Sequence, residues 1–180
     1  MKNIFPVPRN FCAGLAASEV QMTKILVFSD IHFPSRITEF PEGAIAAASG
    51  NADMVLGLGD YDDKKAVDFL YRFSDRVHLV AGNMDAPILK KQLPQTLIVP
   101  VERMRIGLVH GWGIPFGIRA RVQGLFSNID LLCYGHSHEA FYGVENDQYF
   151  FNPGSLASEP RSFGIITVNG NNADCRIIKI

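Results

Sequence analysis

The sequence predicts one α/β domain, and three of its features support this fold class. In the first half, apolar runs of strand length alternate with helix-like segments, which is typical of parallel strands joined by right-handed crossovers. The second half is nearly all strand, with turn signals between antiparallel partners. The chain has 180 residues, of which 47% are hydrophobic, so it can form one substantial core but is short for two domains.

The first half contains three apolar runs and two helical segments. Residues 41–49 are rich in alanine, with Pro41 suited to the first helical position and Gly50 to the stop. Asp62 or Asp63 can cap a second helix that extends to about Ser74, because its apolar residues recur at helical spacing. The three apolar runs, which are expected to form a parallel sheet, cover residues 24–29, 54–58 and 77–81.

The second half is expected to contain one helix and seven strands. The helix covers residues 115–126. Asn146-Asp147 and Asn169-Gly170-Asn171-Asn172 are turn signals of the kind that join antiparallel strands. The expected strands cover residues 97–101, 104–109, 131–134, 140–145, 148–151, 163–168 and 175–180.

Five of the apolar runs end in side chains that can bind metal ions. The carboxyl ends of strands are where open α/β sheets place their ligands. A single histidine after a strand is more often packed or solvent-exposed than a metal ligand, but four of the five histidines of this chain follow such runs. The repeated pattern predicts a shared site that is formed by residues 30–32, 60, 83–85, 110 and 136–138.

Composition and charge narrow the functional class. A charged content of 19% and a net charge of −1, with a pI near 6.5, indicate neither a disordered chain nor a nucleic-acid-binding surface. No apolar run approaches the roughly 20 residues that span a bilayer. Cys12, Cys133 and Cys175 share no CxxC spacing and are expected to be reduced, buried thiols, which fits a cytoplasmic protein.

Residues 1–21 differ from the rest of the chain. Pro6 and Pro8 interrupt this segment, and its short apolar stretch and two basic residues give poor support for a cleaved signal peptide. Met22 directly precedes the first strand and could be the functional start. We therefore expect an N-terminal extension of undefined role over residues 1–21 and the domain over residues 22–180.

The strand-end residues, taken in order, resemble the motifs of the calcineurin-like metallophosphoesterases. The resemblance covers residues 22–180, and the chain is similar in length to the small single-domain phosphodiesterases of bacteria and archaea. It implies a four-layer α-β-β-α sandwich, in which two mixed sheets face each other and a binuclear metal site lies in the loops along one edge. The matching segments are Asp30-Ile31-His32, Gly59-Asp60, Gly82-Asn83-Met84-Asp85, His110-Gly111, Gly135-His136-Ser137-His138 and Asn152-Pro153-Gly154-Ser155.

The resemblance also implies a set of metal ligands. One divalent ion would be held by Asp30, His32 and His138, and the other by Asn83, His110 and His136, with Asp60 as a bridge between them. Mixed imidazole and oxygen ligands suit manganese, which is the first expectation, and also nickel, iron, cobalt or zinc. The absence of cysteine ligands argues against a structural zinc site. Asp60, Asn83 and His110 are expected to act in catalysis as well.

The implied reaction is hydrolysis of a phosphodiester by a hydroxide that bridges the two ions. Two divalent ions and two ligating aspartates leave a charge of about +2, which the hydroxide lowers to about +1 and one phosphodiester anion neutralises. The alternatives are a phosphomonoesterase, a nucleotide pyrophosphatase, or a non-catalytic metal-binding scaffold like the cargo-recognition subunit of retromer. The expected partner is a small phosphoester, and a nucleotide is one of the options. The chain could also form a homo-oligomer.

Two positions depart from the family pattern. Many relatives have a histidine at the positions of Met84 and Trp112, and methionine cannot donate a proton to a leaving group. Tyr61 and Trp112 are candidates for an aromatic wall that stacks on a base or an aryl group. Core packing is the alternative for Trp112.

Three polar residues near these motifs have competing roles. Asp85 either orients a metal ligand or the Asn83 loop, or it caps a helix. Arg161 could meet a phosphate, but a structural salt bridge is expected. His78 lies inside an apolar run rather than at its end, so we expect it not to be a ligand.

Overall fold

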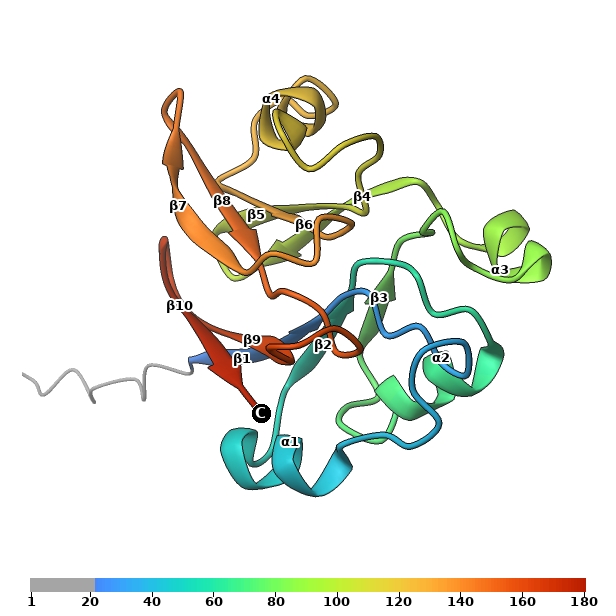
Figure 1. The fold of residues 1–180 in the computed structure, drawn as a ribbon. Coiled ribbons are helices and arrows are strands. Elements are labelled where there is room, and N and C mark those ends of the chain that lie inside the picture. Colours follow the sequence, from blue (N-terminus) through green and yellow to red (C-terminus); the bar gives the residue numbers. More distant parts are fainter. Residues whose placement is uncertain (1–21) are drawn as a thin grey trace, which may run out of the picture.

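The computed structural model describes residues 22–180, and the predicted N-terminal extension over residues 1–21 lies outside the described part. Two five-stranded sheets face each other (Figure 1). The first has the order β10-β9-β1-β2-β3, with β1 (Thr23–Phe28), β2 (Met54–Gly57), β3 (Val77–Leu79), β9 (Ser162–Asn169) and β10 (Asn172–Lys179). The second has the order β4-β5-β6-β8-β7, with β4 (Thr96–Val101), β5 (Met104–Val109), β6 (Leu131–Tyr134), β7 (Phe141–Glu145) and β8 (Gln148–Asn152).

Both sheets are mixed. In the first sheet, β1, β2 and β3 are parallel, whereas β9 runs antiparallel to both β1 and β10. In the second sheet, β5, β6 and β8 are parallel, and the antiparallel strands β4 and β7 form the edges. The parallel strands of both sheets therefore deliver their carboxyl ends to loops, which is where the motif residues lie.

Helices cover the outer faces of the sandwich (Figure 1). Helices α1 (Glu42–Ser49) and α2 (Lys64–Leu70) lie below the first sheet, and α4 (Ile118–Gln123) lies above the second. Helix α3 (Pro87–Gln92) projects from the side, beyond β3. This arrangement confirms the four-layer α-β-β-α sandwich.

Strand β1 shows why the apolar runs are continuous rather than alternating. Ile25 and Val27 point into the core between the two sheets, whereas Leu26 and Phe28 belong to the cluster under α1 and α2. A strand that is buried on both faces requires apolar residues at every position. Burial on both faces also leaves the strand ends as the places where polar side chains of these segments can gather.

The predicted helix boundaries are partly wrong. The helix expected over residues 115–126 covers only Ile118–Gln123, because Gly113 and Gly117 adopt positive φ angles of 80° and 73° and keep the preceding segment irregular. Of the two expected caps, Asp62 and Asp63, it is Asp63 that caps α2, by accepting a hydrogen bond from the Lys65 amide. Helix α3 was not predicted, since only Leu89 in it is buried and no amphipathic pattern marks it.

Two of the three cysteines lie in the described part of the chain. Cys133 and Cys175 are both buried and free, as predicted. Within residues 22–180, no helix is long and apolar enough to cross a membrane.

Candidate metal centre

The structure brings all seven predicted ligands to one edge of the sandwich. Strands β1, β2 and β3 of the first sheet end next to β5 and β6 of the second, so their five loops meet there. Hydrogen bonds fix the loops to one another, from the His32 amide to the Asp60 carbonyl (2.9 Å) and from the Gly135 amide to the His110 carbonyl (3.0 Å). The ligand roles remain a prediction, but the predicted residues do form one cluster.

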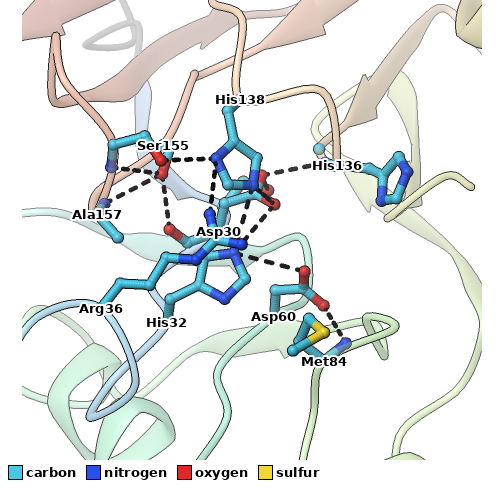
Figure 2. A network of polar contacts seen from close by, with 12 residues as sticks. Asp30, His32, Arg36, Asp60, Met84, His136, His138, Ser155 and Ala157 are labelled. Carbon is cyan, nitrogen blue, oxygen red and sulfur yellow. Dashed lines mark hydrogen bonds and ion pairs between the residues drawn. The ribbon is translucent and has the colours of Figure 1, made fainter. Parts of the chain in front are cut away.

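Asp30, His32 and His138 form one half of this cluster (Figure 2). Oδ1 of Asp30 lies 3.1 Å from Nε2 of His138 and 4.0 Å from Nε2 of His32. The two histidine Nε2 atoms are 3.3 Å apart. Asp30 is fully buried, and its Oδ1 has no hydrogen-bond partner in the described part of the chain. An unpaired buried carboxylate oxygen is costly, so a cation at this point would stabilise the arrangement.

Asn83, His110 and His136 form the other half. Oδ1 of Asn83 lies 3.1 Å from Nε2 of His110 and 2.8 Å from Nδ1 of His136. The two histidine nitrogens that face Asn83 are 3.3 Å from each other. Three potential ligand atoms therefore surround one point on this side as well.

Asp60 lies between the two halves. Its Oδ2 is 3.6 Å from Nε2 of His32 and 3.3 Å from Nε2 of His110. Its Oδ1 accepts a hydrogen bond of 2.6 Å from the Met84 amide. One carboxylate oxygen is thus fixed by the backbone, and the other faces both groups, as a bridging ligand requires.

Hydrogen bonds to the outer ring nitrogens orient the histidines for this role. Nδ1 of His110 lies 2.6 Å from the Leu58 carbonyl, and Nε2 of His136 lies 2.7 Å from the Gly113 carbonyl. A carbonyl can only accept, so these nitrogens carry the protons and the opposite nitrogens have lone pairs for a metal. His32 and His138 have comparable partners in Asp62 (3.2 Å) and Ser158 (2.7 Å).

Burial and charge shift the pKa values of three candidate ligands, in directions that suit metal binding for His32 and Asp60 but not for His110. Burial lowers the pKa of His32, which favours the neutral imidazole. Burial alone would raise the pKa of Asp60, but hydrogen bonds from His110 and the Met84 amide outweigh it and lower this pKa. Burial opposes a charged His110, yet its contact with Asp60 and the nearby carboxylates raise its pKa. In the metal-free site, a proton would lie between His110 and Asp60. A divalent ion that binds there would displace this proton.

Five of the seven residues have left-handed backbone conformations. Non-glycine residues rarely adopt positive φ angles, and such conformations cost on the order of 1 kcal/mol each. Residues of this kind cluster at functional sites, where surrounding structure holds them in place. The φ angles are 53° for Asp30, 46° for His32, 58° for Asp60, 69° for His136 and 59° for His138.

Asp85 joins the loop after β2 to the loop after β3. Its two oxygens accept hydrogen bonds from the Tyr61 amide (2.6 Å) and the Gly82 amide (2.7 Å), and its side chain is buried. Burial raises the pKa of this carboxyl group. The helix-cap alternative is wrong, because α3 begins at Pro87 and Ala86 occupies its N-cap position. Asp85 therefore positions Asp60 and Asn83 through the backbone.

The two aromatic candidates differ. Tyr61 is fully buried, with its hydroxyl donating to the Val80 carbonyl (3.2 Å) and accepting from the Gly59 amide (3.1 Å), so it cannot form a pocket wall. Trp112 is 46% exposed and does not pack in the core. The wall prediction is therefore wrong for Tyr61 and remains open for Trp112.

The structure also shows the surroundings of Arg161 and His78. Arg161 forms an ion pair with Glu159, in which Nε lies 3.2 Å from Oε1, so the salt bridge is confirmed. His78 lies within β3 and belongs to neither group of candidate metal ligands in the described residues. Its pKa is lowered by burial.

Several residues that support the site were not predicted. Asp62, Ser158 and Gly113 hold the outer nitrogens of three histidines, and Ser155 donates a 2.9 Å hydrogen bond to the Asp30 carbonyl. Arg36 lies beside His138 (Figure 2). Only Ser155 lies in a segment that the sequence motifs mark, and the others depend on how loops meet in space.

Known proteins are similar to this chain in sequence and in fold. Residues 23–171 match the family model described as the calcineurin-like phosphoesterase superfamily domain. A probable metallophosphoesterase of Methanothermobacter thermautotrophicus is 32% identical over 159 residues, which cover 85% of this chain and 90% of the relative. The solution structure of a Thermotoga maritima protein is 33% identical, with a TM-score of 0.70 and coverage of 88% of this chain and 99% of that one. Vps29 of Chaetomium thermophilum is 25% identical, with a TM-score of 0.71 and coverage of 88% and 97%.

Proposed function

Because the chain belongs to the calcineurin-like phosphoesterase superfamily, we propose that it is a metal-dependent phosphodiesterase with a binuclear centre. The observation that carries this proposal is the cluster of seven candidate ligands, in which the buried Oδ1 of Asp30 has no hydrogen-bond partner among the described residues and Oδ2 of Asp60 lies between His32 and His110. A chain without a metal function would have little reason to bury four carboxylate and imidazole groups, those of Asp30, His32, Asp60 and His110, at such short distances.

We assign the seven residues to two cations as the family resemblance implies. Asp30, His32 and His138 would hold one ion, Asn83, His110 and His136 the other, and Asp60 both. Bound divalent ions would stabilise the charge on the phosphoryl oxygens and lower the pKa of the attacking water. Imidazole and oxygen ligands suit manganese first, with nickel, iron, cobalt and zinc as alternatives.

Arg36 supports an anionic substrate. Its Nη1 lies 3.5 Å from Nδ1 of His138, yet that nitrogen is already paired with the Ser158 hydroxyl at 2.7 Å. Arg72, Arg119, Arg161 and Arg176 form ion pairs with carboxylates, whereas Arg36 forms none with residues 22–180. An exposed guanidinium without a carboxylate partner at the rim of the site can donate two parallel hydrogen bonds to a phosphate.

Charge and the nature of Met84 favour diesters that have good leaving groups. Two divalent ions, two ligating aspartates and a bridging hydroxide would leave a charge of about +1, which suits the single negative charge of a diester better than the two of a monoester. The Met84 amide donates its hydrogen bond to Asp60, and the exposed side chain of Met84 cannot protonate a leaving oxygen. Aryl or phosphoanhydride leaving groups depart without that proton, so such esters are the expected substrates.

Metal reconstitution tests the proposal directly. Metal-stripped protein should not hydrolyse bis(p-nitrophenyl) phosphate, and addition of Mn²⁺ should restore activity, because the seven ligands then hold two ions. We expect p-nitrophenyl phosphate to be hydrolysed at least about tenfold more slowly than the diester, through its extra charge. The measurements are p-nitrophenol release and metal content. A protein that binds two ions but hydrolyses neither ester would contradict the enzymatic proposal.

Replacing Arg36 by alanine should weaken substrate binding without removing the metal. Loss of a charge-assisted contact to phosphate at an exposed position is expected to raise KM for the aryl diester about tenfold. Manganese content should stay at the wild-type level, and Arg36→Lys should recover part of the effect. The matched control is Arg72→Ala, since Arg72 pairs with Glu42 on the helical face and should not affect KM. An unchanged KM in Arg36→Ala would remove Arg36 from the substrate site.

A non-catalytic scaffold is the second candidate, and the similarity to Vps29 favours it. This alternative predicts that the loaded protein is inert toward phosphoesters. A phosphomonoesterase or a nucleotide pyrophosphatase would use the same residues. The ratio of diester to monoester rates separates the first from the proposed activity, and the ratio of phosphoanhydride to aryl diester rates separates the second.

A further inference from the structure

A groove of about 460 Å³ opens beside the second half of the metal centre. It lies between the loop that follows β3, the start of β4 and the loop that follows β5. Asn83 and His110, two of the candidate ligands, line it directly. A substrate whose phosphate lies at the metal centre would therefore extend its next group into this groove.

Two chemically different sets of side chains line the groove beyond these ligands. Trp112 and Leu125 provide apolar surface, and both are 46% exposed. Gln95 and Thr96 provide an amide and a hydroxyl that can donate and accept hydrogen bonds. A planar group with polar edges and apolar faces fits this combination better than an aliphatic chain does.

Lys90 adds a positive charge to the same groove. Its Nζ donates a hydrogen bond of 2.5 Å to the Asn83 carbonyl, which holds the ammonium next to the ligand loop. Unlike Lys64, which pairs with Asp68, Lys90 forms no ion pair with a carboxylate of residues 22–180. Its remaining donors can meet an oxygen of a sugar or a phosphate.

The loop that carries Trp112 is held in place by Arg121. The Arg121 guanidinium donates to three backbone carbonyls of this loop, those of Trp112 (3.2 Å), Phe116 (2.9 Å) and Ile114. The exposed indole of Trp112 is therefore attached to a backbone segment that these hydrogen bonds hold in place. An aromatic side chain that is presented in this way loses little freedom when a ring stacks on it.

We propose that this groove binds the base of a nucleotide whose phosphodiester lies at the metal centre. The base would stack on Trp112, with its polar edge toward Gln95 and Thr96, and Lys90 would contact the sugar–phosphate part. Stacking on an aromatic residue tolerates any base, because every base has a π face. This inference rests on the proposed function for the position of the phosphate, and it names the substrate class.

Fluorescence offers a test that does not depend on turnover. Trp112 is the sole tryptophan of the chain, so its emission reports on this groove alone. Titration of metal-free protein and of zinc-loaded protein with adenosine 5′-monophosphate should quench or shift the emission. Ribose 5-phosphate, which lacks the base, should cause little change at the same concentration. Equal responses to both compounds would overturn the inference.

Kinetics of Trp112→Ala provide the second test. For thymidine 5′-(p-nitrophenyl phosphate), the variant should raise KM roughly ten- to a hundredfold, with little change in kcat. For methyl p-nitrophenyl phosphate, which has no base, KM should not change. Trp112→Phe should retain most of the binding. Phe116→Ala is the matched control, since Phe116 lies on the same loop, is 87% exposed and does not line the groove.

The two proposals fail in different ways. If both esters are hydrolysed but Trp112→Ala changes neither KM, the groove does not bind a base and the phosphodiesterase proposal survives. If neither ester is hydrolysed while adenosine 5′-monophosphate still quenches the emission and ribose 5-phosphate does not, the groove inference survives and the phosphodiesterase proposal fails.

Discussion

Asp60→Ala is expected to abolish turnover of an aryl phosphodiester and to leave the protein unable to retain two metal ions. Oδ2 of Asp60 faces both halves of the centre, at 3.6 Å from Nε2 of His32 and 3.3 Å from Nε2 of His110. Neighbours that only orient a metal ligand contribute about 10–100-fold to affinity or activity, so loss of a shared ligand should exceed 100-fold. Metal content by elemental analysis and kcat/KM with added Mn²⁺ are the measurements.

Two variants separate this effect from a general loss of structure. Asp60→Asn keeps the size of the side chain and an acceptor for the Met84 amide but removes the charge, so it should fold normally and still lose metal. His78→Ala should retain both ions, since His78 lies within β3 and away from the cluster. An Asp60→Ala protein that is metal-poor and yet fully active would show that the centre is not the catalytic site.

Gly82→Ala is expected to damage the same site from the loop that follows β3. A Cβ at position 82 would lie 2.1 Å from the Asp60 amide nitrogen, 2.3 Å from its Oδ1 and 2.9 Å from the Gly59 carbonyl carbon. These neighbours are mostly backbone and cannot rotate away, so either the loop after β2 or the loop after β3 must shift. We expect a destabilisation of about 3 kcal/mol or more, and a melting temperature lower by on the order of 10 °C.

The control for this substitution is Gly43→Ala. Gly43 lies in α1, and a Cβ there would have no atom within 4 Å. Alanine favours helix over glycine, so this variant should gain about 0.5–1 kcal/mol in the free energy of unfolding. Thermal and urea unfolding measure both effects, and metal content should fall only in Gly82→Ala. Equal stability of the two variants would mean that the loops around Asp60 yield easily.

The strand ends explain why so much of the site could be predicted from the sequence. Strands such as β1 are buried on both faces, so polar residues like Asp30 and His32 stand out where the apolar run stops. Parallel strands share an edge, and the sequence therefore indicates which side chains gather there. The pairing of the two sheets, which brings His110 and His136 to Asp60, followed from the family resemblance rather than from the spacing of residues.

The features that could not be predicted from the sequence are set by the conformation of individual loops. Tyr61 and Trp112 each follow a motif residue directly, yet Tyr61 is fully buried and Trp112 is half exposed. Their difference arises from hydrogen bonds that only the folded chain makes, from Tyr61 to Val80 and from Arg121 to the Trp112 carbonyl. Helix α3 and the position of Arg36 were missed for a similar reason, because neither has a pattern of apolar residues to mark it.

The left-handed backbone of Asp30, His32, Asp60, His136 and His138 has a consequence for related chains that lose the chemistry. Glycine adopts such angles without strain, and asparagine tolerates them better than most residues do. As long as these side chains bind a metal, the backbone strain is kept because the side chains are needed. In a relative that no longer binds the metal, selection for stability alone favours glycine or asparagine at these positions. Glycine or asparagine at these positions is therefore the expected mark of a relative that has kept the sandwich and given up catalysis.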